Sequence, residues 1–209
     1  MSKPWERRAS KGRRGETRPL RDRILIVCEG AKTEPNYFRA FPVKIDVVEI
    51  QIQGVGANTV SLVRDAIRRK EDARQDGAPF NQVWCVFDRD EFPAAHFNEA
   101  FRLANANGVS IAYSNQCFEL WYFLHFDFND AAIHRHAYAE KLATRLGRKY
   151  EKNDPGMYEA LKGRQTTAIR NAKKLLSRYS PCCPETDDPS TIVYLLVERL
   201  NEFAASESD

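Results

Sequence analysis

Ile24-Leu25-Ile26-Val27-Cys28-Glu29-Gly30 is an apolar run that ends on a carboxylate and a glycine. A short run of this kind predicts a strand that is buried on both faces, as in parallel sheets. A second run, Val83-Trp84-Cys85-Val86-Phe87, ends in the same way with Asp88-Arg89-Asp90. Because ligands bind at the carboxyl edge of open α/β sheets, two strands that end in acidic residues predict a metal site at that edge.

Extended and helical patterns alternate through residues 23–128. We expect strands at 24–28, 45–52, 83–87 and 109–113. Helices are expected after each strand, the first from an N-cap at Thr33 to residue 41, the second from a cap at Asn58, the third over 93–106, and the fourth from Ser114 or Asn115. The β-α-β-α order predicts a compact α/β fold, with a parallel sheet of about four strands flanked by helices. Right-handed crossovers then bring the carboxyl ends of the strands to one edge.

The pattern after residue 128 is helical. Candidate helices are 135–146, 157–161, 164–179 and 190–203, with Asp188 and Ser190 as capping side chains for the last. The predicted organisation is a basic arm (1–22), an α/β core (23–128), and a helical C-terminal part (129–203) that packs on the core or caps its active edge.

The composition is that of a globular protein, with 43% hydrophobic and 29% charged residues among 209. No apolar run is long enough to span a bilayer, and the basic N-terminus lacks the apolar segment of a signal peptide. The five cysteines show no C-x-x-C spacing, so neither a zinc site nor a disulfide framework is predicted. We expect a reduced, cytoplasmic setting without membrane contact.

The positive charge is concentrated at the N-terminus. Residues 1–23 contain nine Lys or Arg and three acidic residues, whereas the remainder has a net charge of −3. We interpret residues 1–22 as disordered. Such an arm can neutralise nucleic-acid phosphates, and about six contacts on a duplex would give a slope near −5 in log affinity against log salt. A solubilising tail without a partner is the alternative.

The acidic residues at the two strand ends suit a divalent metal. Asp88 and Asp90 are two positions apart, so in an extended segment they project to the same side. If the two strands are neighbours, Glu29 faces them and either binds the metal or moves a proton. Mg²⁺ needs only two or three carboxylates, since it keeps several waters. In the alternative interpretation, Asp88 caps a helix and Glu29 is a solvated loop residue.

Other charged residues are candidates for the same site. Glu119 lies in an apolar helical run, so its carboxylate needs a metal, a donor, a proton or a buried arginine. Lys32 and Thr33 lie at a helix entrance that would attract a phosphate. Lys152 could reach the scissile phosphate or be simply exposed. His125 is either a donor near the site or an ordinary amphipathic histidine.

Three motifs resemble those of RloB-like proteins. The first is Cys28-Glu29-Gly30-Ala31-Lys32-Thr33-Glu34-Pro35-Asn36-Tyr37-Phe38, and the second is Phe87-Asp88-Arg89-Asp90. The third is Ser114-Asn115-Gln116-Cys117-Phe118-Glu119-Leu120-Trp121 with Leu124-His125-Phe126, similar to S-N-P-x-F-E-x-W. Gln116 stands where a proline is usual, from which we expect a less rigid turn. The resemblance extends from about residue 23 to 200.

RloB-like proteins are similar to the Toprim class, so the resemblance implies a Toprim-like sheet. It matches Glu29 to the Toprim glutamate, and Asp88 and Asp90 to the D-x-D pair. It thereby implies Mg²⁺- or Mn²⁺-dependent phosphodiester chemistry, with Ser114 and Asn115 of the third motif as substrate-binding candidates. It also implies cleavage of RNA, tRNA included, or DNA in phage defence and abortive infection, beside an ABC-type ATPase. No G-x-x-x-x-G-K-[ST] P-loop is present, so a partner would supply ATPase activity.

Three functions are open at this stage. The first is a metal-dependent nuclease in which Glu29, Asp88, Asp90, Glu119 and Lys152 form the catalytic set. The second is a nucleic-acid-binding or regulatory subunit of a defence complex without catalysis of its own. The third is a phosphotransferase or nucleotide-processing enzyme that uses the same carboxylates. The oligomeric state is open as well, with a homo-oligomer among the alternatives.

Overall fold

The computed structural model describes residues 22–43, 48–55, 59–89 and 93–205, and its centre is a five-stranded sheet with the order β2-β1-β3-β4-β5. The strands are β1 Asp22–Cys28, β2 Val48–Gly54, β3 Gln82–Asp88, β4 Ser110–Asn115 and β5 Ser190–Thr191. The first four strands are parallel, and β5 is antiparallel to β4. The predicted α/β class is confirmed, and the arrangement is consistent with a Toprim-like fold. Two-residue β5 is not predicted, because so short a strand has no periodic pattern.

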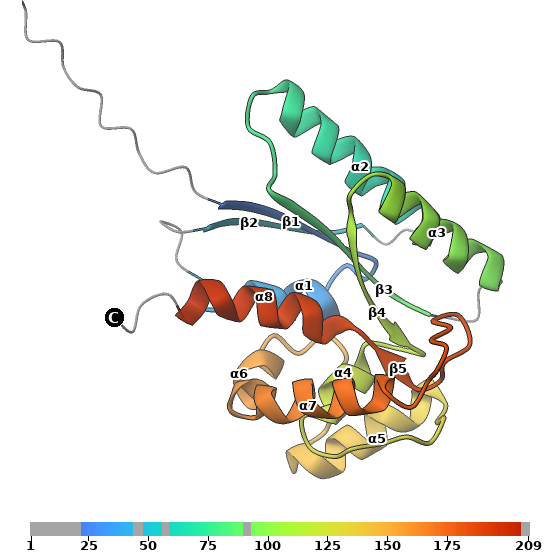
Figure 1. Ribbon diagram of the computed structural model, residues 1–209. Helices are drawn as coiled ribbons and strands as arrows, with labels where there is room; N and C mark the ends of the chain where they lie inside the picture. The colour runs from blue at the N-terminus through green and yellow to red at the C-terminus, as the bar shows by residue number, and fades with distance from the viewer. Residues whose placement is uncertain (1–21, 44–47, 56–58, 90–92, 206–209) are drawn as a thin grey trace, which may run out of the picture.

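Helices cover both faces of the sheet (Figure 1). One face carries α2 Thr59–Gln75 and α3 Ala94–Ala106. The other carries α1 Thr33–Arg39, α4 Glu119–Leu124, α5 Arg135–Leu146, α6 Met157–Leu161, the 3-10 helix η1 Lys162–Arg164, α7 Gln165–Leu176 and α8 Val193–Ala205. The expected C-terminal helices thus form with nearly the predicted bounds, and they share one sheet face with α1 and α4.

The sheet separates two apolar cores. Successive side chains of a strand point to opposite faces, so Leu25 and Val27 of β1 pack with α2 and α3. Ile24, Ile26 and Cys28 face the opposite core, which α1 and α4 to α8 complete. Burial on both faces explains why the run is apolar without alternation.

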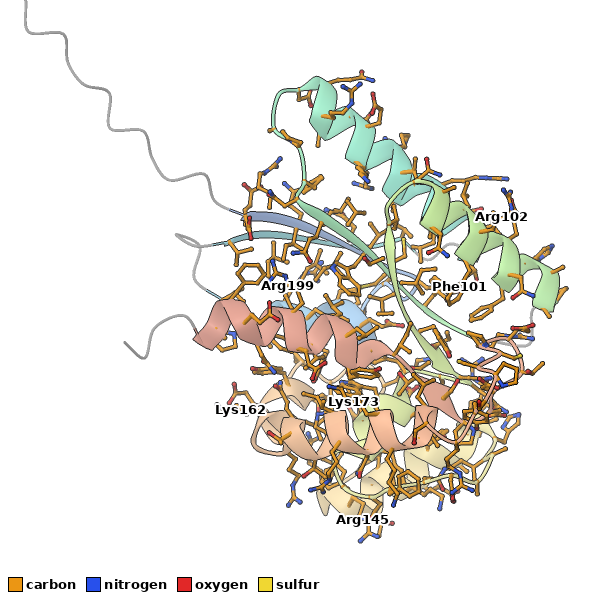
Figure 2. The ribbon with its side chains drawn as sticks, viewed as in Figure 1. Phe101, Arg102, Arg145, Lys162, Lys173 and Arg199 are labelled. Atoms are coloured by element: carbon orange, nitrogen blue, oxygen red, sulfur yellow. The ribbon has the colours of Figure 1, made fainter. Side chains whose placement is uncertain are left out.

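Aromatic rings fill the core between the sheet and α3. Phe101 of α3, labelled in Figure 2, lies with its ring centroid 5.8 Å from that of Tyr113 on β4. Phe97 contacts both rings, with its centroid 4.9 Å from that of Phe101 and 5.5 Å from that of Tyr113. These edge and tilted contacts fix α3 against the strands whose carboxyl ends carry Asp88 and Asn115.

The helices on the face that carries α1 and α4 to α8 form a layer that is stabilised by apolar packing and by surface ion pairs. All six residues of α4 are buried, which makes this short helix the centre of that layer. Lys173 of α7, labelled in Figure 2, forms an ion pair with Glu198 of α8 at 2.6 Å. Within the described ranges, no helix combines the length and apolar character needed to cross a membrane.

Several predicted helix ends are wrong. Helix α1 begins at Thr33, and the Thr33 hydroxyl donates to the Lys152 carbonyl instead of capping the helix. Ser114 and Asn115 end β4 rather than open a helix. The side chain that accepts a hydrogen bond from the first turn of α8 is Thr191, at 3.3 Å from the Val193 nitrogen, and not Ser190 or Asp188. The Asn58 cap and the basic arm through residue 21 lie outside the described residues.

Candidate metal centre

The ends of β1 and β3 lie side by side. Cys28 pairs with Val86 in a parallel register, and the Glu29 nitrogen donates to the Val86 carbonyl at 2.8 Å. The Glu29 Oε2 accepts from the Asp88 nitrogen at 3.1 Å. The expectation that Glu29 faces the acidic end of β3 is therefore confirmed, and Glu29 is more than a solvated loop residue. Asp88 belongs to β3, well before the first residue of α3, so it does not cap that helix.

Two glycines allow the loop after β1 to fold tightly. A Cβ at Gly54, the last residue of β2, would lie 2.6 Å from the Gly30 carbonyl oxygen and 2.7 Å from the Ala31 Cα. A Cβ at Gly30 would lie 2.1 Å from Oε2 of Glu34. The loop therefore packs on the end of β2, and the space above Gly30 holds a carboxylate.

That carboxylate, Glu34, is a site residue that the sequence reasoning missed. Its side chain is only 6% exposed although it lies in the first turn of α1, and its Oε2 has no hydrogen-bond partner. Burial, with the neighbouring charge of Glu119, raises the pKa of Glu34, while backbone N–H groups and Lys152 oppose the rise. The sequence did contain a signal, because Glu34 lies three and four positions before Tyr37 and Phe38 and so shares their apolar helix face, where an acid needs a partner.

Asp88 is the most perturbed acid of the group. Burial raises the pKa of Asp88 well above its ordinary value, and the charges of Glu34, Glu119 and Glu29 raise it further, whereas Arg135 lowers it. The Asp88 Oδ1 is buried without a hydrogen-bond partner. An acid in this setting is stabilised by a proton or by a cation.

Glu119, the first residue of α4, is a further acid near this group. Its side chain is 7% exposed, and its Oε1 accepts a hydrogen bond from the Tyr150 hydroxyl at 3.0 Å. Burial and the nearby Glu119 charge raise the pKa of Tyr150, so the hydroxyl stays protonated and donates. Of the partners left open for Glu119, namely a metal, a donor, a proton or a buried arginine, the structure shows a donor, the Tyr150 hydroxyl.

Glu29, Glu34 and Asp88 border a cleft of about 350 Å³, which we call the acidic cleft. Its lining residues are Glu29, Gly30, Ala31, Lys32, Thr33, Glu34, Asp88, Arg135, Lys152 and Asn153. Lys152, from a distant part of the chain, therefore meets Glu29 and Asp88 in the same cleft as the predicted residues Lys32 and Thr33. Arg135, at the start of α5, is a further cation that sequence reasoning missed, since its helix is far from both strand ends in the chain.

Hydrogen bonds fix the segment that carries Lys152 against α1. The Thr33 hydroxyl donates to the Lys152 carbonyl at 2.9 Å, and the Asn36 amide donates to the Asn153 carbonyl at 3.1 Å. The helical part thereby supplies a wall of the acidic cleft, which explains how Lys152 comes close enough to lower the pKa of Glu34.

Two predicted substrate-binding residues lie elsewhere. Ser114 is fully buried, and its hydroxyl shares a 2.9 Å hydrogen bond with the Thr191 hydroxyl, so direct contact with a substrate is contradicted. Asn115 donates from its amide to the Asp187 carbonyl at 2.9 Å and lines a neighbouring cavity. Both side chains join β4 to the segment around β5, a contact that no sequence pattern indicates.

Gln116 and His125 have structural roles. The Gln116 side-chain amide donates to Asp188 Oδ2 at 2.9 Å, and its oxygen accepts from the Arg135 backbone nitrogen at 3.2 Å, so two hydrogen bonds hold this turn. His125 is completely buried and its Nδ1 lies 2.9 Å from the Trp121 carbonyl oxygen. Burial lowers the pKa of His125 to about 4, so the ring is neutral.

The donor set fits a hard divalent cation. Asp88 Oδ1 and Glu34 Oε2 are buried oxygens without partners, Glu29 lies beside them, and Mg²⁺ and Mn²⁺ prefer oxygen ligands. Among the described residues, no three His, Cys, Asp or Glu side chains are already gathered closely enough to enclose an ion. Asp90, the second residue of the predicted pair, lies outside the described residues.

The family comparison agrees with the motifs. A family model described as RloB-like protein matches residues 24–200, a span that includes every described residue of the acidic cleft. No curated protein and no solved structure matches the chain.

Proposed function

The chain belongs to the RloB-like family, and on that premise we propose that it is a metal-dependent nuclease that cleaves phosphodiester bonds of RNA or DNA. One observation carries the proposal: two buried carboxylate oxygens without partners, on Asp88 and Glu34, lie in a cleft whose rim is cationic. Such a combination suits a metal ion held by acids and a phosphate held by cations.

The charge distribution supports a bound cation. Burial and three neighbouring carboxylates destabilise the charged form of Asp88. The positive charge of Arg135 opposes this destabilisation. A divalent ion would satisfy the unpartnered oxygens and remove the repulsion between the acids. In this proposal Glu29, Asp88 and Asp90 are the metal ligands, and Glu34 is a fourth carboxylate at the same site.

In this proposal the cationic side chains and the metal have different roles in phosphodiester cleavage. Lys32, Arg135 and Lys152 line the acidic cleft, where they would bind the phosphate and offset the charge of the transition state. A bound Mg²⁺ or Mn²⁺ would supply Lewis acidity toward the phosphoryl oxygen and lower the pKa of a bound water. Glu119 acts on this chemistry through the charge that it adds beside Asp88.

The biological setting follows from the family resemblance. We propose action in the cytoplasm during phage defence or abortive infection, with an ABC-type ATPase as the partner. The basic arm of residues 1–22 would contact further phosphates of the substrate strand, so the affinity for the strand would fall as salt concentration rises.

A second candidate function is a nucleic-acid-binding subunit without catalysis. It is favoured by the finding that no three acidic, His or Cys side chains in the described ranges already surround an ion position. Deleting residues 1–22 separates the two functions, because a pure binder loses most of its affinity whereas a nuclease keeps its cleavage centre.

The deciding experiment joins Mn²⁺ calorimetry to cleavage assays on RNA and DNA. We expect wild-type protein to bind Mn²⁺ and cleave, and Asp88→Asn or Glu29→Gln to lose cleavage by at least about a hundredfold with the fold intact. Asp72→Asn, at an exposed site on α2, is the matched control and stays active. Unchanged cleavage by a highly purified Asp88→Asn, Asp90→Asn double variant would refute the proposal.

A further inference from the structure

Two basic side chains of the helical layer lie against aromatic rings. Phe126 and Phe128, in the segment that follows α4, are half-buried. The Arg164 guanidinium, at the end of η1, lies over the Phe126 ring at 5.2 Å from its centroid, and the Lys174 ammonium of α7 lies over the Phe128 ring at 4.2 Å. A ring face holds a cation in place without cancelling its charge, whereas a carboxylate cancels it.

The same segment gathers two further cations. Arg145 of α5 forms an ion pair with Asp127 at 2.5 Å, and Arg178, two residues after α7, forms one with Asp130 at 2.8 Å. Figure 2 shows Arg145 at the end of the helical layer that lies away from the sheet. Residues 126–130 thus bring together cations from α5 and from the region of η1 and α7.

Arg170 extends this group along α7. It is exposed and lies four residues before Lys174, so the two side chains share one face of the helix. We call Arg145, Arg164, Arg170, Lys174 and Arg178 the basic patch. Among the described residues, no carboxylate lies within ion-pair distance of Arg164, Arg170 or Lys174, so three positive charges of the patch are not compensated.

The charge of the chain as a whole is divided in the same sense. Residues 129–203 contain 13 Lys or Arg against 10 Asp or Glu, whereas residues 23–128 contain 11 against 14. The carboxylates of the acidic cleft repel a polyanion until a metal binds, so a nucleic acid that enters the cleft needs cations elsewhere on the surface. The basic patch provides three of them.

The basic patch is within reach of a strand that occupies the acidic cleft. Lys152 lines the cleft, and Arg145 of the patch precedes it by seven residues, which span at most about 25 Å. Lys149, exposed between them in the chain, is a further cation on this route. A strand of about eight nucleotides, at roughly 3.4 Å each, covers that distance.

We propose that the basic patch binds the phosphate backbone of the nucleic acid whose scissile phosphate lies in the acidic cleft. This inference rests on the proposed function, to which it adds a second contact surface. Arginine donates paired N–H groups to phosphate oxygens, and lysine adds a point charge. Because phosphates are the same at every nucleotide, the patch contributes affinity and orientation without a base preference.

The test measures binding in EDTA, where metal-dependent cleavage does not occur. Fluorescence anisotropy follows labelled single-stranded RNA and DNA of about 20 nucleotides, which at roughly 3.4 Å each span both the cleft and the patch. The full-length wild type is compared with the triple variant Arg164→Gln, Arg170→Gln, Lys174→Gln at several salt concentrations.

Each phosphate contact on a single strand contributes about 0.7 to the slope of log affinity against log salt. We therefore expect the slope of the triple variant to be shallower by about 2, and its affinity at low salt to be at least about tenfold lower. Mn²⁺ binding measured by calorimetry should not change, because none of the three residues lines the acidic cleft.

Two control variants separate this surface from the total charge of the chain. Arg64→Gln, Arg74→Gln, Arg102→Gln removes three exposed cations from α2 and α3, on the opposite face of the sheet, and should keep the wild-type slope. A charge-conserving variant of the patch, in which the two arginines become lysine and the lysine becomes arginine, should keep it as well.

An unchanged slope in the triple variant would overturn the inference and would leave an acidic protein surface as the partner that the charge fits. An equal loss in the α2 and α3 variant would overturn it too, since binding would then follow total charge. The outcome is separable from that of the proposed function. Mn²⁺-dependent cleavage with an unchanged slope overturns only the patch assignment, whereas a patch-dependent slope without cleavage supports the assignment and overturns only the nuclease.

Discussion

Replacing Asp88 by asparagine should stabilise the metal-free protein at neutral pH, although most substitutions of a buried residue destabilise. The reason is electrostatic. Burial and three neighbouring carboxylates raise the pKa of Asp88 above its ordinary value of 3.8. A carboxyl whose pKa is raised by folding stabilises the fold below its unfolded pKa, and this contribution is lost as pH rises through the folded pKa. The asparagine side chain has the same shape without the charge.

Proton linkage sets an upper limit on this gain in the free energy of unfolding. One pH unit is worth about 1.4 kcal/mol, so between 3.8 and pH 7 a raised pKa can remove at most about 4 kcal/mol. Asp88 is half-buried rather than fully enclosed, so water screens part of the repulsion. We therefore expect about 2 kcal/mol, which corresponds to about 4–8 °C in Tm for a chain of this size.

The assay is thermal unfolding of wild type and Asp88→Asn in EDTA from pH 4 to pH 8. Because other titrating groups are common to both proteins, the difference in Tm isolates the contribution of Asp88. We expect the variant to have the higher Tm at pH 7 and the difference to shrink toward pH 4. Added Mn²⁺ should raise the Tm of the wild type and raise that of the variant much less.

Asp72→Asn provides the control for loss of a carboxylate, because Asp72 forms an exposed ion pair with Arg68. That variant should change Tm by little and in the same way at every pH. A lower Tm of Asp88→Asn at pH 7 in EDTA would refute the reasoning, since it would mean that the charged carboxylate stabilises the metal-free fold through hydrogen bonds.

Three further predictions concern the fold around the site. Gly54→Ala places a Cβ 2.6 Å from a backbone oxygen and should cost about 1–3 kcal/mol in denaturant unfolding, whereas Gly163→Ala, where nothing lies within 4 Å, should not destabilise. Tyr150→Phe removes the 3.0 Å hydrogen bond to the buried Glu119 and should also cost about 1–3 kcal/mol in denaturant unfolding. His125 has its pKa lowered to about 4, so stability should be lost as pH falls from 6.5, by roughly 3 kcal/mol in total, and His125→Asn should abolish this dependence.

The strand ends were predictable because their physical cause is local. Buried parallel strands require continuous apolar runs, and the runs that end at Glu29 and Asp88 are visible in the sequence. The β-α alternation then places both ends at one edge without any knowledge of side-chain contacts. That β1 and β3 are neighbours was a condition of the predicted site, and the structure shows that they pair directly.

The remaining parts of the site depend on contacts between distant segments. Glu34 was missed because an acid in the first turn of a helix is ordinarily explained by the helix dipole. Its burial arises from the fold of the loop onto Gly54 and from the helical layer above it. Arg135 and Tyr150 come from that layer, and their distance from the strand ends is set by the packing of α5 and α6, which no local pattern encodes.

Ser114 shows why a motif residue can be misassigned. Its place in the third motif made it a substrate-binding candidate through the family resemblance. The structure adds the short antiparallel β5, which covers Ser114 and pairs with its hydroxyl through Thr191. A site at a sheet edge is therefore shaped as much by the segment that covers it as by the strands themselves.

The acidic cleft links stability and chemistry through a single property, the placement of carboxylates where they repel one another. Four acids, from the loop after β1 and from α1, β3 and α4, lie close enough to repel one another beside cations that do not neutralise them all. A fold optimised only for stability would replace at least one of them, as the expected gain from Asp88→Asn illustrates. Retaining the charge is physically sensible when a divalent ion occupies the site in the working protein, because the repulsion that weakens the empty fold then becomes affinity for the metal.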